Sequence, residues 1–149
     1  GVYKAELLDI VAQIALSLGY TRGMFVHGVD GMDEISLLGK TRVNEIHKGS
    51  IISYEIAPED FGFSRCSIED ICTGTPEMNA AVIRRVFSGK DKGSRCQAII
   101  LNAAGALLVG EKANTFKEGI EMAAEIIASG QADKKLQQLI TASRDIRSA

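Results

Sequence analysis

The chain has 149 residues, of which 46% are hydrophobic and 24% are charged, and its formal net charge is -2. A chain of this length and apolar content is expected to fold as one domain, residues 1–149, around its own core. The slightly acidic balance provides no basic field that would attract nucleic acid or an anionic membrane. We therefore expect small molecules or proteins as partners, and neither nucleic acid nor a membrane.

The cysteine pattern bears on the compartment. Cys66, Cys72 and Cys96 are an odd number and show no C-x-x-C spacing. This pattern argues against a disulfide framework and against a zinc site, and it fits a reducing cytoplasm. We expect all three to be small buried hydrophobic residues.

The sequence shows neither a membrane span nor a leader. The longest apolar stretch, residues 96–109, is interrupted by Gln97 and Asn102 and is too short to span a bilayer. No cationic, apolar leader opens the chain, which starts on Gly1 rather than on methionine. We therefore expect that the start of the sequence is a cut.

Five segments have apolar residues at the three- and four-residue steps typical of helices. They are Lys4–Leu18, Pro76–Phe87 after the N-cap Thr75, Cys96–Val109, a segment from the capping box of Thr115 and Glu118 to Gly130, and a last segment with Leu136, Leu139 and Ile140. Residues 96–109 are apolar on almost every side, which predicts a central helix packed on several faces. Gly105 and the alanines of this helix should allow its neighbours to approach closely.

Three shorter segments have the features of strands. Met24–His27 is an apolar run between glycines, which favours a buried strand. Val43–His47 and Ile51–Ala57 flank Lys48-Gly49, which predicts an antiparallel hairpin. Residues 60–74 should form a loop with at most one short turn. Strands alternating with helices in this way predict an α/β fold.

The run His27-Gly28-Val29-Asp30-Gly31-Met32-Asp33-Glu34 places three carboxylates and a histidine after the first predicted strand. In open α/β sheets, ligands bind at the carboxyl ends of strands. Adjacent side chains on a straight strand point to opposite faces, but Gly28 and Gly31 can adopt backbone angles closed to other residues. Asp33 and Glu34 can therefore converge on one hard cation such as Mg²⁺, which takes one or two carboxylates, water and substrate phosphate.

A second explanation of this run is a solvated acidic turn. In that case Asp30 or Asp33 would accept a hydrogen bond from the backbone of its own loop, as aspartates in turns often do. Because acidic turns with glycine are common, the spacing alone favours this structural explanation.

Other polar residues are assigned to structure. His27 is expected to be a packed residue with one hydrogen bond, and His47, beside the hairpin turn, is expected to be exposed. Asn79 and Asn102 lie in helical segments, where such side chains usually bond to a neighbouring backbone and do not contact substrate.

Several segments together resemble the anthranilate phosphoribosyltransferases in order and spacing. They are Gly1-Val2-Tyr3, the acidic run above, Tyr54-Glu55-Ile56-Ala57-Pro58-Glu59-Asp60-Phe61-Gly62, Asn79-Ala80-Ala81-Val82-Ile83 with Gly89, and Leu101-Asn102-Ala103-Ala104. The resemblance covers essentially the whole chain. It implies the C-terminal part of a nucleoside phosphorylase/phosphoribosyltransferase-type α/β domain, with a mixed sheet, a small antiparallel hairpin and flanking helices.

The resemblance also implies an activity. Family members transfer phosphoribosyl from phosphoribosyl pyrophosphate to the amine of anthranilate, with release of pyrophosphate, in cytoplasmic tryptophan biosynthesis. The aspartate and glutamate that match Asp33 and Glu34 coordinate Mg²⁺ on the pyrophosphate. As the bond from ribose to pyrophosphate loosens, negative charge builds on the leaving group, so a cation there lowers the barrier.

The resemblance leaves most of the family's site outside this chain. The glycine-rich phosphate loop, the lysine-histidine-glycine-asparagine segment and the anthranilate-binding arginine all lie upstream in family members. We therefore expect no catalytic and no direct substrate-binding residue here beyond the metal pair, and an inactive fragment. The N-terminal helical domain, through which family members form homodimers, also lies upstream.

Two alternatives remain open at this point. A pyrimidine-nucleoside phosphorylase has the same type of fold but handles phosphate without the metal pair, so Asp33 and Glu34 discriminate against it. A non-catalytic relative that binds nucleic acid would be expected to have a basic surface, and the net charge of -2 speaks against it.

Overall fold

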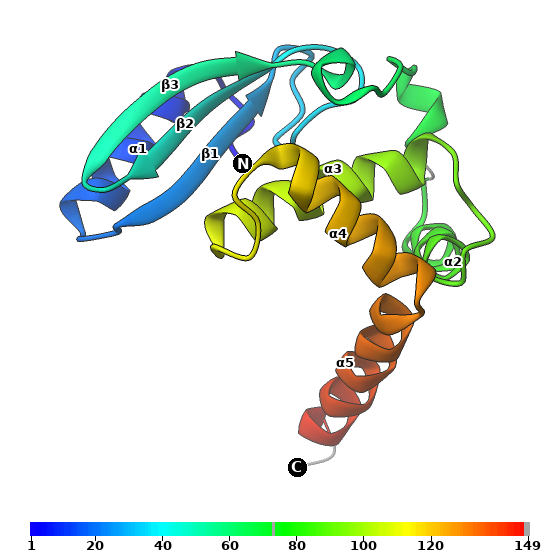
Figure 1. Cartoon of the computed structure of the whole chain (residues 1–149). Helices are drawn as coiled ribbons and strands as arrows, with labels where there is room; N and C mark the ends of the chain where they lie inside the picture. The colour runs from blue at the N-terminus through cyan, green and yellow to red at the C-terminus, as the bar shows by residue number, and fades with distance from the viewer. Residues whose placement is uncertain (73, 148–149) are drawn as a thin grey trace.

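The computed structural model describes residues 1–72 and 74–147. In chain order the elements are α1 (Glu6–Ser17), β1 (Arg22–Gly28), β2 (Thr41–His47), β3 (Ser50–Ile56), the 3-10 turns η1 (Pro58–Phe61) and η2 (Ile68–Asp70), α2 (Pro76–Phe87), α3 (Ser94–Val109), α4 (Phe116–Ala128) and α5 (Gln131–Arg147). The sheet with α1 behind it lies beside the group of helices α2 to α4, and α5 extends away from that group (Figure 1).

The sheet has the order β1-β2-β3 with antiparallel pairing throughout. The predicted hairpin is confirmed, since Lys48 and Gly49 both have positive φ angles, 51° and 77°, as a tight two-residue turn requires. The predicted α/β class is confirmed, but the mixed sheet is wrong for the described residues. Each of these strands returns beside the previous one, whereas a parallel pair would need a crossover between them.

Helix α1 covers one face of this sheet and confirms the first predicted helix. Its buried residues Leu8, Ala12 and Ala15 lie at three- and four-residue steps. The amide of Asn44 on β2, which is only 2% exposed, donates to Asp9 Oδ1 at 2.7 Å. This bond provides a buried polar group with a partner and fixes the helix over the middle strand.

Helix α3 joins the sheet to the other helices, as its predicted apolar character on several faces requires. Its fully buried Leu101 packs in a core cluster with residues of the strands and the loop after β1, namely Val26, Ile35, Leu37, Val43 and Ile56. A Cβ on Gly105 would lie 2.9 Å from Ile35 Cδ1, so the predicted close approach at this glycine is confirmed. A second cluster, of Val86, Cys96 and Ile127, joins α2, α3 and α4.

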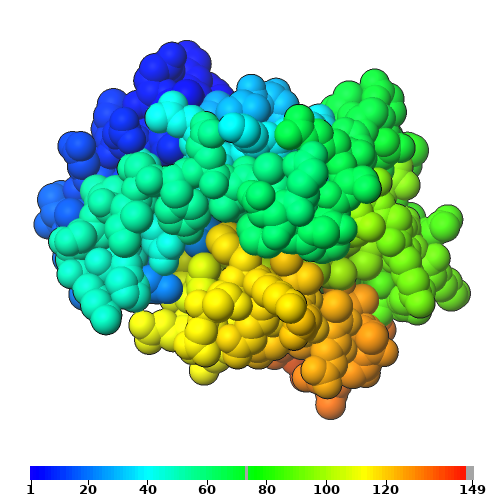
Figure 2. All heavy atoms as spheres, turned by 45° about the horizontal axis from the view of Figure 1, so that its top comes forward, coloured from blue at the N-terminus to red at the C-terminus, as the bar shows by residue number. Residues whose placement is uncertain are grey.

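The segment after β3 differs from its prediction. At most one short turn was expected in residues 60–74, of which residue 73 lies outside the described part, but η1 and η2 are two separate 3-10 turns. Each follows from one aspartate, since Asp60 accepts from the Ala57 amide at 2.7 Å and Asp70 from the Ser67 amide at 2.9 Å. The segment lies between the hairpin and the helices (Figure 2).

The start of α4 is confirmed in part. Thr115 Oγ1 accepts from the Glu118 amide at 3.2 Å, as its predicted capping role requires. The carboxylate of Glu118, however, accepts from the Asn114 amide at 2.8 Å and not from that of Thr115, so the reciprocal half of the capping box is shifted by one residue.

No helix in the described part of the chain has the length and apolar character needed to cross a membrane.

Helices α3 and α4 approach each other closely at Gly119. A Cβ there would lie 3.0 Å from both Cα and the carbonyl oxygen of Ala104. We predict that Gly119→Ala lowers the free energy of unfolding by about 1–3 kcal/mol, because the backbone of α3 must move away. Urea denaturation measures this change. Glu121→Ala, at an exposed position of the same helix, is the control and should change stability by less than about 0.5 kcal/mol.

The direction of the change in the free energy of unfolding distinguishes a closely packed glycine from one without such a contact. In a helix without such a contact, alanine in place of glycine adds about 0.5–1 kcal/mol of stability. A more stable Gly119→Ala variant would therefore contradict the close packing of α3 on α4.

Candidate metal centre

The structure places Asp33 and Glu34 in the loop that follows the carboxyl end of β1. Both residues are exposed. In the part of the chain that the structure describes, neither carboxylate has a hydrogen bond or an ion pair. Their oxygens are therefore available to a ligand from solvent.

Asp30 has the structural role that was the alternative explanation of the acidic run. Its Oδ1 accepts from the Met32 amide at 3.0 Å, and its Oδ2 accepts from the Ser36 hydroxyl at 2.5 Å. Ser36 is 2% exposed, and its hydroxyl also accepts from the Leu38 amide at 2.9 Å. The structural explanation thus holds for Asp30, whose two oxygens brace the loop, and it does not hold for Asp33.

The two glycines of the loop act in different ways. Gly31 has φ +94°, a left-handed conformation that favours glycine, as predicted. Gly28 was expected to be able to take such an angle as well, but its φ is not positive, and the missing side chain provides space instead. A Cβ there would lie 2.6 Å from Asp30 Oδ1 and 3.1 Å from Ser36 Cβ. The loop therefore folds tightly back over the end of β1.

Asn102 of α3 anchors the other end of the acidic pair. Its Oδ1 accepts from the Ile35 amide at 2.9 Å, and its Nδ2 donates to the carbonyls of Ile35 at 2.9 Å and Ala98 at 3.0 Å. Ile35 itself is 5% exposed and part of the core cluster. The predicted structural role of Asn102 is confirmed, and it fixes the residue directly after Glu34.

The first residues of the chain pack against the same loop. A Cβ on Gly1 would overlap the carbonyl oxygen of Asp33, at 1.5 Å. The Val2 amide donates to the Val26 carbonyl at 3.0 Å, and Nδ1 of the buried His27 donates to the Val2 carbonyl at 2.8 Å. The prediction of a packed histidine with one hydrogen bond is therefore confirmed for His27.

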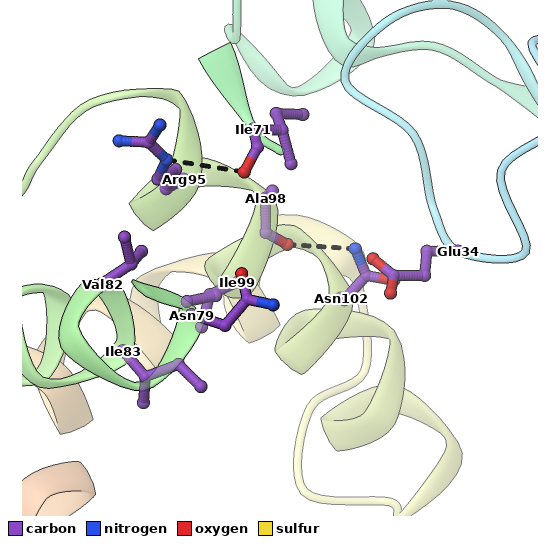
Figure 3. A pocket seen from close by; sticks show the side chains of 9 residues that line it. All are labelled: Glu34, Ile71, Asn79, Val82, Ile83, Arg95, Ala98, Ile99 and Asn102. Carbon is purple, nitrogen blue, oxygen red and sulfur yellow. Dashed lines mark hydrogen bonds between the residues drawn. The ribbon is translucent and has the colours of Figure 1, made fainter. Parts of the chain in front are cut away.

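Glu34 lines an open cavity of about 670 Å³ between the loop, η2, α2 and α3. Arg95 and Glu34 lie on opposite sides of it, with Asn79 and Asn102 between them (Figure 3). The Arg95 Nε donates to the Ile71 carbonyl at 3.5 Å and so joins α3 to the end of η2.

Arg95 and Asn79 line this cavity, although the sequence pattern did not single out Arg95 and predicted a structural role for Asn79. Arg95 lies seven residues before Asn102, so helical periodicity alone places both on one face of α3. Asn79 is exposed, and among the described residues its side chain has no hydrogen bond to a backbone group, unlike the structural role predicted for it. Its amide faces the cavity instead (Figure 3).

A second polar cluster lies at the opposite end of β1. The guanidinium of Arg22 pairs with Glu45 at 2.8 Å and donates to His47 Nδ1, so His47 is half-buried and not exposed as predicted. The Tyr54 hydroxyl donates to Glu45 at 2.8 Å. Burial, and then this bond to an acceptor carboxylate, raise the pKa of Tyr54 above its usual value. This cluster joins the three strands and is separate from the acidic pair.

All three cysteines are free thiols. Cys96 is buried, as predicted, but Cys66 is half-buried and Cys72 is exposed. Burial raises the pKa of both Cys66 and Cys96, which keeps these two in the unreactive thiol form.

The donor set suits Mg²⁺ better than a transition metal. Within residues 1–72 and 74–147, no group of three or more His, Cys, Asp or Glu side chains comes together. Two hard carboxylate ligands leave the remaining coordination positions to water or phosphate, as is usual for Mg²⁺. Zinc sites, in contrast, normally take three or four protein ligands that include Cys or His.

The chain is similar to known proteins over almost its full length. It is 41% identical over 140 residues to the anthranilate phosphoribosyltransferase of Acetivibrio thermocellus, which covers 94% of this chain and 40% of that protein. It is 44% identical over 143 residues to the enzyme of that name from Parvibaculum lavamentivorans, covering 96% of this chain and 42% of the relative. The chain thus spans about two fifths of the length of these relatives.

Solved structures agree with this similarity. The crystal structure of anthranilate phosphoribosyltransferase from Thermus thermophilus matches with a TM-score of 0.84 at 38% identity, over 95% of this chain and 41% of that one. The Saccharomyces cerevisiae enzyme in complex with PRPP and Mg matches with a TM-score of 0.86 at 29% identity, over 97% and 42%.

The match to a family description is equally extensive. Residues 1–133 match the model of the family that is described as "Glycosyl transferase family, a/b domain". The resemblance noted in the sequence is therefore confirmed, and the chain belongs to the glycosyl transferase family, a/b domain.

Proposed function

We propose that this chain is the Mg²⁺-binding part of an anthranilate phosphoribosyltransferase, with Asp33 and Glu34 as the metal ligands. The observation that carries the proposal is a pair of carboxylates that have no partner within residues 1–72 and 74–147, in a loop braced by Asp30 and Asn102. The relatives at 41% and 44% identity bear this enzyme's name, and a similar yeast structure contains PRPP and Mg. These names favour the transferase over a pyrimidine-nucleoside phosphorylase or a nucleic-acid-binding relative.

The reaction breaks the bond from ribose C1 to the pyrophosphate oxygen and forms a bond from C1 to the anthranilate nitrogen. The pyrophosphate leaves with the bonding electron pair, and the amine nitrogen, once bonded to C1, loses its extra proton to solvent water. Mg²⁺, when bound, stabilises the negative charge that develops on the leaving group. Asp33 and Glu34 would hold the ion there, and the hydrogen bonds of Asp30 and Asn102 would fix the loop that carries them. Such preorganisation, and not a strong base, is what this chain supplies.

The proposal also concerns the three fifths of the relatives' length that this chain does not cover. We propose that residues 1–149 form one unit of the catalytic domain, and that upstream segments hold most of the phosphoribosyl pyrophosphate and the anthranilate. The complete enzyme would be a homodimer in the cytoplasm, where reduced thiols such as the exposed Cys72 persist.

The metal ligands can be tested in a chimera in which this chain replaces the matching segment of the Acetivibrio thermocellus enzyme. We predict that Asp33→Asn with Glu34→Gln lowers kcat/KM at least about 100-fold, because transition-state charge on the pyrophosphate loses its stabilisation. Higher Mg²⁺ concentrations should restore part of the loss. The control is Glu121→Gln, an exposed change on α4. Full activity of the double variant at low Mg²⁺ would exclude these residues as ligands.

Asn102 should act on the metal indirectly. Asn102→Leu removes three hydrogen bonds. It should cost about 1–3 kcal/mol of stability for each backbone group left buried and unpaired. In the chimera we predict that the affinity for Mg²⁺ also falls about 10- to 100-fold, as is typical when residues that orient metal ligands are removed.

Asn79→Leu is the matched control, because Asn79 lies on the same cavity without these bonds. Stability from urea denaturation and the Mg²⁺ dependence of the rate are measured together. Loss of stability with an unchanged Mg²⁺ requirement would show that Asn102 supports the fold alone.

The chain by itself should show no turnover of anthranilate. A loop with two carboxylates provides ligands for a metal ion, but it provides few groups that hold a sugar or an aromatic acid in place. Release of pyrophosphate from phosphoribosyl pyrophosphate, measured with purified chain and anthranilate, should equal the rate without protein. A rate that depends on both anthranilate and chain would contradict the division of the site.

A further inference from the structure

Strand β1 lies at one edge of the sheet, because it pairs with β2 on one side only. In an antiparallel pair, successive residues turn their amide and carbonyl alternately toward the partner strand and away from it. Val26 is turned away from β2, since its carbonyl accepts from the Val2 amide at 3.0 Å. Met24, two residues earlier, is therefore turned the same way.

Three of these outward groups have no partner in the described part of the chain. They are the Met24 amide, the Met24 carbonyl and the Val26 amide. A row of unpaired backbone groups on an edge strand is a template for a further strand.

An apolar cavity of about 430 Å³ lies beside this edge. Its lining comes mainly from one strand and one helix, with Met24 and Val26 on β1 and Gly105, Ala106 and Val109 on α3. Within residues 1–72 and 74–147, the lining includes no residue of β2 or β3 and no charged residue. The cavity therefore lies between the edge strand and α3, where alternate side chains of an added strand would point.

The contact of Val2 also gives the direction of such a strand. Two directly opposite residues of an antiparallel bonded pair exchange both of their N–H···O bonds. Val2 and Val26 do not, because the Val2 carbonyl accepts from His27 Nδ1 at 2.8 Å and not from the Val26 amide. Helix α1 follows Val2, covers one face of the sheet and leads back to the start of β1. A helix in this position is the usual crossover between two parallel strands.

We propose that the free edge of β1 and the cavity beside it bind an apolar extended segment as a fourth strand, parallel to β1. The proposed occupant is the segment that directly precedes Gly1 in the complete enzyme, so this inference rests on the proposed function. The relatives have about three fifths of their length outside the match, which provides such a segment.

The register follows from the bond that is already present. Counting back from Val2, the residue directly before Gly1 is the next one whose backbone groups point toward β1. Its amide would donate to the Met24 carbonyl, and its carbonyl would accept from the Val26 amide. The Met24 amide would donate to the carbonyl two residues further upstream. One strand in this register therefore satisfies all three unpaired groups of β1.

The probe is a synthetic peptide of about ten residues, enough for one strand. It has the sequence that directly precedes the matched segment in the Acetivibrio thermocellus relative. It is titrated into the purified 149-residue chain without Mg²⁺ or substrates, and amide hydrogen exchange is followed by NMR. We expect saturable binding and at least about 10-fold slower exchange at the amides of Met24 and Val26, because both gain an acceptor.

Three results would overturn the proposal. Two of them are the absence of saturable binding and unchanged exchange at both amides. The third is protection of these amides in the free chain that grows with chain concentration, because a second copy would then occupy the edge.

Two methylated peptides test the register. N-methylation of the last residue removes the donor to the Met24 carbonyl and should weaken binding at least about 10-fold. The same change on the residue before it is the matched control. That amide points away from β1, so the affinity should stay within about 2-fold. Equal loss of affinity in the two peptides would contradict the parallel register.

A variant of α3 tests the cavity. Val109→Glu places a charge in the apolar lining and should weaken peptide binding at least about 10-fold. Gln97→Glu, on the same helix but outside this lining, is the control and should leave the affinity unchanged. Urea denaturation checks that each variant folds, and the methylated peptides provide the answer if Val109→Glu does not. Unchanged binding in a folded Val109→Glu chain would show that the peptide binds elsewhere.

The outcome for the added strand can be separated from the outcome for the proposed function. An active chimera together with no binding of the peptide to the chain would overturn the added strand alone. Peptide binding with the expected protection, together with an inactive chimera, would overturn the transferase assignment and leave the added strand in place.

Discussion

The hydrogen bonds between Asn102 and Ile35 are the contact on which the acidic loop depends. One side chain pairs with both the amide and the carbonyl of a single loop residue, and with its own helix at Ala98. Ile35 is buried in the core between the sheet and α3. The position of Glu34 is therefore set by a helix that lies far away in the sequence. An amide with both a donor and an acceptor is suited to this double contact.

From this contact the three carboxylates of the run acquire different roles. Both carboxylate oxygens of Asp30 accept hydrogen bonds within the loop, from Met32 and Ser36. Asp33 and Glu34 are exposed and have no partner in the part of the chain that the structure describes. A rigid loop with free ligands loses little entropy when it binds a cation, which is the general advantage of a preorganised site. Gly28 and Gly31 contribute by allowing the tight path of the loop.

Local patterns were enough to predict the helices and the hairpin. The stop at Gly19, the N-caps Thr75 and Thr115 and the turn at Lys48-Gly49 are local signals, and all four act as predicted. The acidic loop could be identified as a candidate site because it follows an apolar strand.

Long-range geometry could not be predicted in the same way. The bonds of Asn102 to Ile35 span 67 positions and those of Arg22 to His47 span 25, so no sequence window contains either pair. The antiparallel pairing of β1 depends on the path of the loop between β1 and β2, which is set by Ser36 and Asp30. The spacing of Asp30, Asp33 and Glu34 likewise does not show which carboxylate has a structural role. The hydrogen bonds of the folded loop show that it is Asp30.

The most direct test of the metal assignment is paramagnetic NMR with Mn²⁺ in place of Mg²⁺ on the isotope-labelled chain. Line broadening by Mn²⁺ falls steeply with distance, so it locates the ion without any need for turnover. We predict that the strongest broadening is centred on the amides of Asp33 and Glu34 and is lost in the Asp33→Asn, Glu34→Gln variant. Broadening centred on another acidic residue, or unchanged in the variant, would contradict the assignment.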